Sequence, residues 1–103
     1  ELVTALKQEL HVPLHLHTHD STGNGVSTVL MAAEAGVDIV DLAIESMSSI
    51  TSQPSMNAVV EALRGSKRDT GLDFEELDEL SRYYGRIRKV YEQFESDIES
   101  SEC

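Results

Sequence analysis

The chain has 103 residues, of which 40% are hydrophobic and 26% are charged, and its formal net charge is −11. This length suits one small domain, and no run comes near the roughly 18–20 apolar residues of a membrane-spanning helix. A surface this acidic repels the phosphates of nucleic acids and anionic lipids, so we expect neither nucleic acid nor membrane as a partner.

The first elements are a helix and a short strand. Residues 1–9 place Leu2 and Leu6 at helical spacing, which predicts the last turns of a helix. They lack the basic region and apolar core of a signal peptide, and the chain does not begin with Met, so we expect it to start within a longer protein. Pro13 forbids continuation of the helix and suits the start of a strand, which we predict over residues 13–17.

A second helix and a second strand follow a turn-rich segment. Residues 25–35 are rich in Val, Leu, Met and Ala, which predicts a helix. Asn24 or Ser27 would cap its start, and Gly36 would end it. Residues 37–43 are dense in apolar side chains, as expected of a strand that helices cover.

A loop and a third helix come next. The loop of residues 45–53 is full of Ser, Thr and Met. Pro54 suits the first turn of a helix over residues 55–63, which Gly65 would close.

The longest helix is predicted after the charged connector of residues 66–71. Asp73 as the cap and Glu76 three residues later form a capping pair. Apolar residues then step by three and four, which is a strong amphipathic stripe. The stripe consists of Leu77, Leu80, Tyr84, Ile87, Tyr91, Phe94 and Ile98.

We expect residues 99–103 to be a frayed tail. The single Cys103 cannot form an internal disulfide, which is typical of a reducing compartment such as the cytoplasm.

This order of elements predicts an α/β fold. Alternating strands and helices imply parallel strands with right-handed crossovers. Two parallel strands cannot cover their own edges, and a full (β/α)8 barrel needs roughly 200–250 residues. The chain therefore reads as a piece of a larger α/β barrel or sheet.

The most informative segment is the histidine-rich end of the first strand. His15, His17 and His19 share one face because strand side chains alternate, and Leu14 and Leu16 share the other. Two imidazoles at i and i+2 beside a carboxylate can chelate one divalent metal ion, and inward residues at the carboxyl end of a barrel strand line the active site. A polar strand end with solvated histidines explains the pattern equally well.

Two neighbours of this pair have supporting roles. His15 lies roughly 6–7 Å deeper along the strand, so we expect it to hydrogen-bond or to support the ligands. Asp20 could bind the metal, orient a ligand or cap the following turn. Because the residue after His19 points to the other face, the spacing favours the two supporting roles for Asp20.

The loop of residues 45–53 would lie on the same rim of a barrel as the histidines. Thr51, Ser52 and Gln53 offer hydroxyls and an amide that could bind a small polar substrate. An ordinary helix start, capped by Thr51 or Ser52 and followed by Pro54, explains each hydroxyl better when it is taken singly.

No motif for other chemistry stands out. Asp38 and Asp41 lie on opposite faces of the second strand, so they are not a paired-carboxylate dyad. Residues 23–25 lack the Lys of a phosphate-binding loop. No Ser/His/Asp or Cys/His arrangement suggests a nucleophile, and we name no catalytic residue within this chain.

Several motifs, taken in order, resemble one known family. They are LHLHTHDSTG at residues 14–23, AGVDIVD at 35–41, SMS at 46–48, TSQPS at 51–55 and FESDI at 94–98. Together they are similar to the carboxyltransferase domain of pyruvate carboxylases, whose relatives are the α subunit of oxaloacetate decarboxylase and the 5S subunit of transcarboxylase. Asp20 and the Thr-Ser-Gln-Pro stretch look more like pyruvate carboxylases than like the decarboxylase. Ser49 departs from the family, which usually has Gly after Met-Ser, and this bears on the local shape of the loop.

The resemblance implies a fold and a metal site. Residues 1–71 would be the last two βα units of a (β/α)8 TIM barrel, and residues 72–98 the start of its helical extension. His17 and His19 would match the family's metal-binding pair, which typically holds Mn²⁺ or Zn²⁺. The family's other metal ligands, an Asp and a carbamylated Lys, come from earlier strands. Its pyruvate-binding Arg and proton-shuttling Thr also lie outside these residues. We therefore expect this chain alone to be inactive.

The resemblance also implies a reaction and its partners. Biotin on a carrier domain would deliver a carboxyl group to pyruvate, giving oxaloacetate, with ATP used at a separate biotin carboxylase domain. The partners would be the rest of the barrel, the carrier domain and further copies of the parent enzyme. Two alternatives remain open: a decarboxylase or transcarboxylase type of subunit, or a non-catalytic module whose apolar stripe pairs with another helix.

Overall fold

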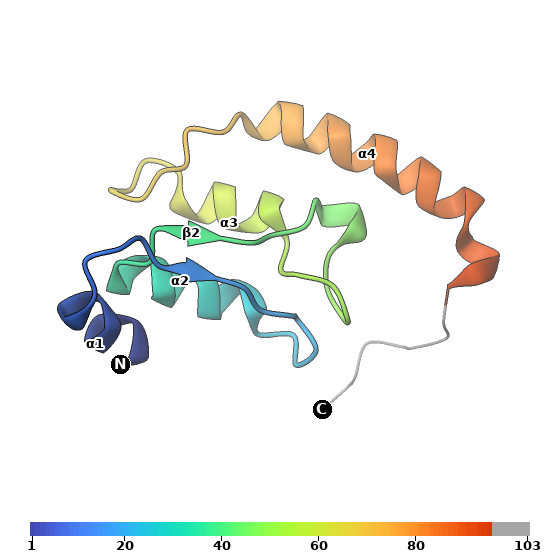
Figure 1. Ribbon diagram of the computed structural model, residues 1–103. Coiled ribbons are helices and arrows are strands. Elements are labelled where there is room, and N and C mark those ends of the chain that lie inside the picture. The colour runs from blue at the N-terminus through green and yellow to red at the C-terminus, as the bar shows by residue number, and fades with distance from the viewer. Residues whose placement is uncertain (96–103) are drawn as a thin grey trace.

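Residues 1–95 are described by a computed structural model, in which helices and strands follow the predicted order. The elements are α1 (Leu2–Glu9), β1 (His15–Leu16), α2 (Gly25–Ala35), β2 (Ile39–Val40), the 3-10 helix η1 (Glu45–Met47), α3 (Met56–Leu63), α4 (Phe74–Val90) and the 3-10 helix η2 (Glu92–Phe94). Consecutive helices from α1 to α4 contact one another, and Figure 1 shows α4 crossing the molecule on the far side of α3 from the strands. No helix in this part of the chain is long and apolar enough to span a bilayer.

The two strands pair in parallel, as the alternation of elements predicted. His15 lies opposite Ile39, and Leu16 lies opposite Val40. The paired ladder is shorter than the strands predicted over residues 13–17 and 37–43, because within residues 1–95 each strand has a single strand partner. This is the arrangement expected of part of a barrel, and it leaves an unpaired edge on each side of the ladder.

The apolar core lies between the strands and α2. Ala32, Ala33 and Val37 are buried at the end of α2 and in the turn that follows it. Leu16 and Val40, one from each strand, pack against this cluster. The alternation predicted for the first strand is confirmed, because the leucines face this core while the histidines between them are exposed.

The predicted cap of α2 is corrected by the structure. Asn24 occupies the N-cap position, but its side chain makes no capping hydrogen bond. Instead Oδ1 of Asp20 accepts a hydrogen bond from the backbone N–H of Gly25 at 2.7 Å. The side-chain oxygen of Asn24 accepts from the hydroxyl of Thr22 instead. The other end is as predicted: Gly36 ends the helix with a φ of 108°, in the left-handed region that glycine adopts without a Cβ clash.

The predicted position of Pro54 is also wrong. Pro54 lies before α3 rather than in its first turn, and Ser55 is the N-cap, accepting from the N–H of Ala58 at 3.2 Å. The carbonyl of Pro54 accepts instead from the N–H of Ala43 at 3.0 Å. The reason is that Ser55 forms an isolated parallel bridge with Ala43, which holds this segment extended.

The cap of α4 is as predicted, but the helix is shorter than its apolar stripe. The carboxylate of Asp73 accepts from the N–H groups of Glu75 and Glu76 at 2.8 and 3.1 Å. The helix ends at Val90, so Tyr91 and Phe94 lie beyond it. Ile98 and the tail of residues 99–103 lie outside the described residues.

The face of α4 that packs on the rest of the chain shares Leu77 with the apolar stripe but leaves much of the stripe exposed. Leu77 and Ser81 are buried, whereas Leu80 is 49% exposed and Phe94 is 76% exposed. Gly85 continues the buried face and brings the helix backbone close to Ser46 of η1. Small side chains allow this close approach and turn most of the apolar stripe toward solvent.

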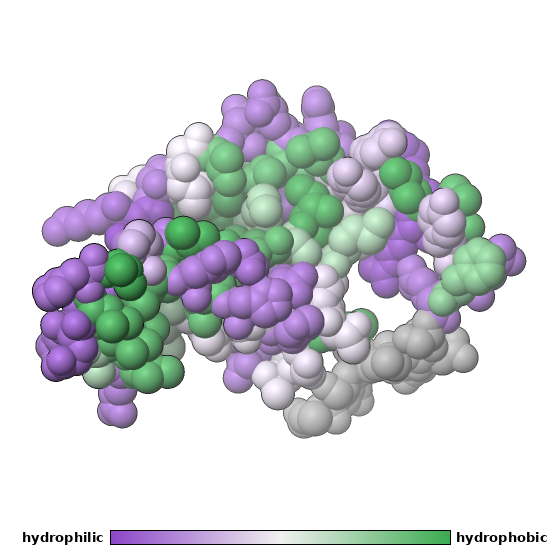
Figure 2. All heavy atoms as spheres, in the orientation of Figure 1, coloured by the Kyte–Doolittle hydropathy of each residue, from purple (hydrophilic) through white to green (hydrophobic). Residues whose placement is uncertain are grey.

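Apolar side chains are also exposed at the opposite end of the molecule. Leu2 of α1 and Met31 of α2 are each 72% exposed. Figure 2 shows hydrophobic residues at the surface over this end, beside hydrophilic ones. Together with the open strand edges, these surfaces are what a section cut from a larger barrel is expected to expose.

Candidate metal site

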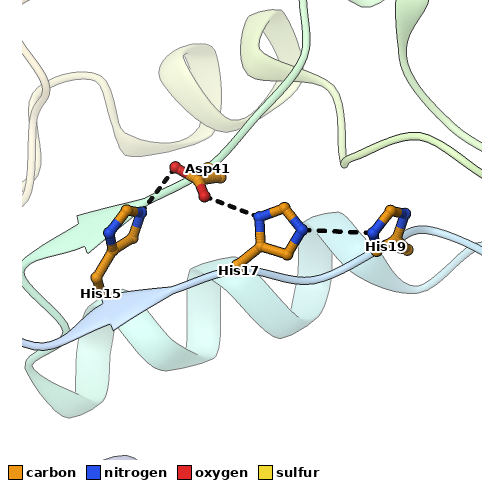
Figure 3. A network of polar contacts seen from close by, with 4 residues as sticks. All are labelled: His15, His17, His19 and Asp41. Atoms are coloured by element: carbon orange, nitrogen blue, oxygen red, sulfur yellow. Dashed lines mark hydrogen bonds and ion pairs between the residues drawn. The ribbon is translucent and has the colours of Figure 1, made fainter.

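The side chains of three histidines, in β1 and just after it, point away from the core. His15 lies in the strand, and His17 and His19 continue its direction at alternate positions. Figure 3 shows the three rings in a row beside Asp41, which follows β2 directly. Parallel pairing places the carboxyl ends of both strands at one edge, and so the carboxylate of the second strand reaches the histidines of the first.

Asp41 joins two of these histidines. Its Oδ1 lies 2.7 Å from Nε2 of His15, and its Oδ2 lies 2.8 Å from Nδ1 of His17. These two hydrogen bonds, chiefly the one from His17, hold the pKa of Asp41 below its ordinary value. An ionised carboxylate only accepts hydrogen bonds, so the proton of the His17 ring is on Nδ1.

A backbone carbonyl orients the third histidine in the same way. Nδ1 of His19 donates to the carbonyl oxygen of Thr51 at 2.6 Å. In the neutral rings of His17 and His19, the lone pair is then on Nε2 in both cases. These two Nε2 atoms lie 3.3 Å apart, with the ring planes at 76° to one another.

Two lone pairs that face each other at this distance repel, and a shared cation relieves the repulsion. Two nitrogens bound at about 2.0–2.1 Å to one zinc ion at a tetrahedral angle lie roughly 3.3 Å apart. Histidine ligands typically donate their other ring N–H to a carboxylate or carbonyl, which is what Asp41 and Thr51 accept here. The pair therefore fits two ligand positions of one divalent ion. Within residues 1–95 no group of three or more His, Cys, Asp or Glu side chains is placed to hold a metal ion, so an ion here would take further ligands from elsewhere.

The two residues predicted to support the pair lie in different places. His15 contacts Asp41 and so acts on the site through that carboxylate. Asp20 is buried at 8% exposure and caps α2, one of the roles that its spacing allowed. Its N–H donates to the carbonyl of Ser52 at 2.9 Å, which ties the end of the histidine segment to the loop.

The residues predicted for the substrate rim form hydrogen bonds near the histidine pair through their backbone carbonyls rather than through their side chains. The carbonyl of Thr51 binds His19, that of Ser52 binds Asp20, and that of Gln53 accepts from Ser49 at 3.0 Å. Thr51 and Ser52 also line a pocket of about 290 Å³ between this loop and the end of α4. Gln53 does not line that pocket.

Asp41 is the site residue that sequence reasoning missed. The strand pattern pointed to it only as half of a rejected dyad with Asp38, and the structure confirms that the two carboxylates serve different partners. Asp38 accepts from the N–H of Leu14 at 2.8 Å and pairs with Lys7 at 2.9 Å. The signal that could have found Asp41 is its position near the carboxyl end of a strand predicted to lie parallel to the histidine strand.

The chain matches known proteins along nearly its whole length. A family model described as HMGL-like matches residues 1–83. Pyruvate carboxylase of Staphylococcus aureus is 49% identical over 100 residues, and that of Bacillus subtilis is 45% identical over 100 residues. In each case the alignment covers 97% of this chain but 9% of the relative, so the chain spans about a tenth of their length.

The fold also matches a solved structure. The carboxyl transferase domain of Rhizobium etli pyruvate carboxylase, solved with pyruvate and biocytin, superposes with a TM-score of 0.94 at 46% identity. The match covers 96% of this chain and 17% of that domain. It confirms the predicted fold class, part of a carboxyltransferase barrel.

Proposed function

The chain belongs to the HMGL-like family, and we propose that it is the part of a pyruvate carboxylase-type carboxyltransferase that supplies two histidine ligands to a divalent metal site. In this proposal His17 and His19 are the ligands. Asp41, which also binds His15, orients His17, and the carbonyl of Thr51 orients His19. The observation that carries it is the pair of Nε2 atoms 3.3 Å apart, each on a ring whose Nδ1 binds an acceptor. The likeness to pyruvate carboxylases at 45–49% identity supports the reaction.

The proposed reaction transfers a carboxyl group from biotin to pyruvate and yields oxaloacetate. Mn²⁺ or Zn²⁺ at this site would polarise the keto oxygen of pyruvate and stabilise the negative charge that develops there. Two acceptors of this chain hold the imidazoles in the tautomer that presents Nε2: the carboxylate of Asp41 for His17, and the backbone carbonyl of Thr51 for His19. A ligand set fixed in this way needs little rearrangement when the ion binds.

The proposed partners match the surfaces that the chain leaves exposed. The rest of the barrel would pair with the open strand edges and cover apolar residues such as Leu2 and Leu80. Biotin would arrive on a carrier domain, ATP would be used at a separate biotin carboxylase domain, and the parent enzyme would be a homo-oligomer in the cytoplasm. A decarboxylase or transcarboxylase type of subunit remains the alternative within the same chemistry.

The test uses the intact polypeptide that contains these residues, stripped of metal by a chelator. Adding Mn²⁺ or Zn²⁺ should raise its melting temperature and restore transfer of the carboxyl group between oxaloacetate and biotin. His17→Ala and His19→Ala should each abolish both effects. His11→Ala, an exposed histidine before β1, is the matched control and should respond like the wild type. If all three variants respond like the wild type, the metal assignment is wrong.

A second candidate function is helix-mediated association, and the exposure of the α4 stripe favours it. Leu80 and Tyr84 are 49% and 40% exposed on a helix that packs through its other face. If association is the main role, Leu80→Asp should dissociate an oligomer while the metal response survives. Analytical ultracentrifugation of the intact polypeptide measures this outcome.

A further inference from the structure

The loop that orients His19 is closed at its base and spans from β2 to α3. We call residues 45–53 the rim loop. Just outside it, the N–H of Ala43 donates to the carbonyl of Pro54 at 3.0 Å, and the N–H of Met56 donates to the carbonyl of Ala43 at 2.7 Å. Both ends of the rim loop are therefore fixed to one another, and its shape depends on contacts made within the loop and beyond it.

The middle of the rim loop has a backbone conformation that these residues rarely adopt. Ser49 and Ile50 have φ angles of 74° and 55°, in the left-handed region. A β-branched residue such as isoleucine is especially uncommon there. Such a conformation persists only where surrounding contacts hold it, so the neighbours of the rim loop determine its shape.

Helix α4 supplies two of those contacts, both at the backbone of Ser46. Oγ of Ser81 accepts from the N–H of Ser46 at 3.0 Å, and Nη1 of Arg88 donates to the carbonyl of Ser46 at 2.9 Å. Ser81 and Arg88 lie two turns apart on one face of α4. Gly85 lies between them, and a Cβ added there would be 3.6 Å from Cβ of Ser46, which shows how closely the helix approaches.

The guanidinium of Arg88 is itself fixed by a second residue. Its Nε and Nη2 donate to the two carboxylate oxygens of Glu95 at 2.7 and 3.2 Å. This fork leaves Nη1 directed at Ser46, and the pairing raises the pKa of Arg88 and lowers that of Glu95. Bidentate pairs of this kind add directional specificity to an ion pair that would otherwise contribute little at a solvent-exposed position.

We propose that Arg88 is a positioning residue for the candidate metal site, acting through the rim loop on His19. The path runs from Glu95 to Arg88, from Arg88 to the carbonyl of Ser46, along the rim loop, and from the carbonyl of Thr51 to Nδ1 of His19. Arg88 touches neither the histidine pair nor a substrate. This inference rests on the proposed function, because it assigns the arginine a role in the geometry of the same metal site.

The test compares two arginines of α4 in the intact polypeptide. Arg88→Gln removes the fork and the contact with Ser46. Arg82→Gln is the matched control, because Arg82 pairs with Asp78 within α4 rather than with the rim loop. The probe is Co²⁺, whose visible absorption spectrum reports the geometry of its ligands. Arg88→Gln should shift that spectrum and weaken Co²⁺ binding roughly threefold to tenfold, less than the 10–100-fold typical of a direct partner of a ligand.

A second measurement does not depend on the metal. Hydrogen exchange of the rim-loop peptide, followed by mass spectrometry without Co²⁺, should be faster in Arg88→Gln than in Arg82→Gln. Arg88→Lys can still donate one hydrogen bond to Ser46, so it should restore part of the Co²⁺ affinity. A merely structural role would lower the melting temperature of Arg88→Gln without a change in the Co²⁺ spectrum.

The outcomes separate this inference from the proposed function. If the wild type binds Co²⁺ and His19→Ala does not, the metal site stands. An Arg88→Gln spectrum and affinity equal to those of Arg82→Gln would then overturn the role of Arg88 alone. If wild type and His19→Ala bind Co²⁺ equally, or neither binds it, the metal site is wrong and the positioning role falls with it.

Discussion

Oδ2 of Asp41 accepts a hydrogen bond from Nδ1 of His17 at 2.8 Å, across 24 positions of sequence. The same carboxylate binds His15 through its other oxygen, so its orientation is fixed from two sides. The consequence for His17 is a single tautomer with the lone pair on Nε2, the atom that faces His19. A residue with no contact to the proposed metal ion thus determines whether one of its ligands can bind.

We expect Asp41→Asn to weaken Mn²⁺ binding by the intact polypeptide roughly 10–100-fold. An amide nitrogen turned toward His17 would make Nδ1 the acceptor and move the ring proton to Nε2, where it blocks the metal. Calorimetric titration with Mn²⁺ measures the affinity. Asp38→Asn is the control, because that carboxylate binds Leu14 and Lys7 instead. Equal affinities in the two variants would show that Asp41 does not orient the ligand.

A pH effect on stability is expected from Asp38. The N–H of Leu14, and next the ammonium of Lys7, hold the pKa of Asp38 below its ordinary value of 3.8. Its contribution to stability is therefore complete above pH 3.8 and is lost as the pH falls through the lowered pKa. Urea unfolding of wild type and Asp38→Asn at several pH values should show the wild type favoured at neutral pH and the difference shrinking in acid. A difference that stays constant down to about pH 2 would refute this linkage.

Two glycines should respond in opposite ways to alanine. A Cβ at Gly25 would lie 2.6 Å from Oδ1 of Asp20 and 2.6 Å from Cγ of Pro54, both on buried side chains. Gly25→Ala should destabilise the protein by about 1–3 kcal/mol. Gly85→Ala, inside α4 with its nearest neighbour at 3.6 Å, should stabilise it by about 0.5–1 kcal/mol. Thermal unfolding distinguishes the two signs, and a stable Gly25→Ala would mean that Asp20 and Pro54 can move apart.

Ser49 has a backbone conformation that favours glycine, the residue that carboxyltransferase domains of pyruvate carboxylases usually have at this position. Its φ of 74° costs an L-residue roughly 1–2 kcal/mol. Glycine avoids this cost, but it also makes the unfolded chain more flexible, which offsets part of the gain in stability. We expect Ser49→Gly to stabilise the protein by about 0.5–1 kcal/mol. Ser48→Gly is the control: Ser48 is extended at φ −91° and its hydroxyl binds the carbonyl of Glu45, so this change should destabilise. Destabilisation by Ser49→Gly, seen in thermal unfolding, would show that its side chain matters more than its backbone.

The sequence alone was sufficient to predict the order of the helices and strands and the strand face that carries His17 and His19. Alternation within the histidine segment placed His17 and His19 together, and the caps at Asp73 and Gly36 were predicted correctly. These signals act over a few neighbouring residues, where backbone sterics and hydrogen bonds decide the outcome without the rest of the fold. The motif resemblance likewise indicated the carboxyltransferase barrel that the comparisons confirm.

Most of the predictions that were wrong depend on residues distant in sequence. Pro54 lies outside α3 because Ser55 bridges to Ala43. Asn24 makes no capping bond, and its Oδ1 accepts instead from the hydroxyl of Thr22. The apolar stripe extends past the end of α4, and besides Leu77 the helix packs through Ser81 and Gly85, small residues that no hydrophobic pattern marks.

What the sequence determined by itself is therefore the α/β order, the histidine pair and its family likeness. Only the tertiary structure decided which groups orient that pair. The partners of His17 and His19 lie 24 and 32 positions away, and one of them is a backbone carbonyl that any residue could supply. Contacts of this kind form when β1, β2 and the rim loop come together, so a local sequence pattern carries no information about them. A hydrogen bond to a backbone carbonyl depends on the path of the chain and not on the side chain at that position.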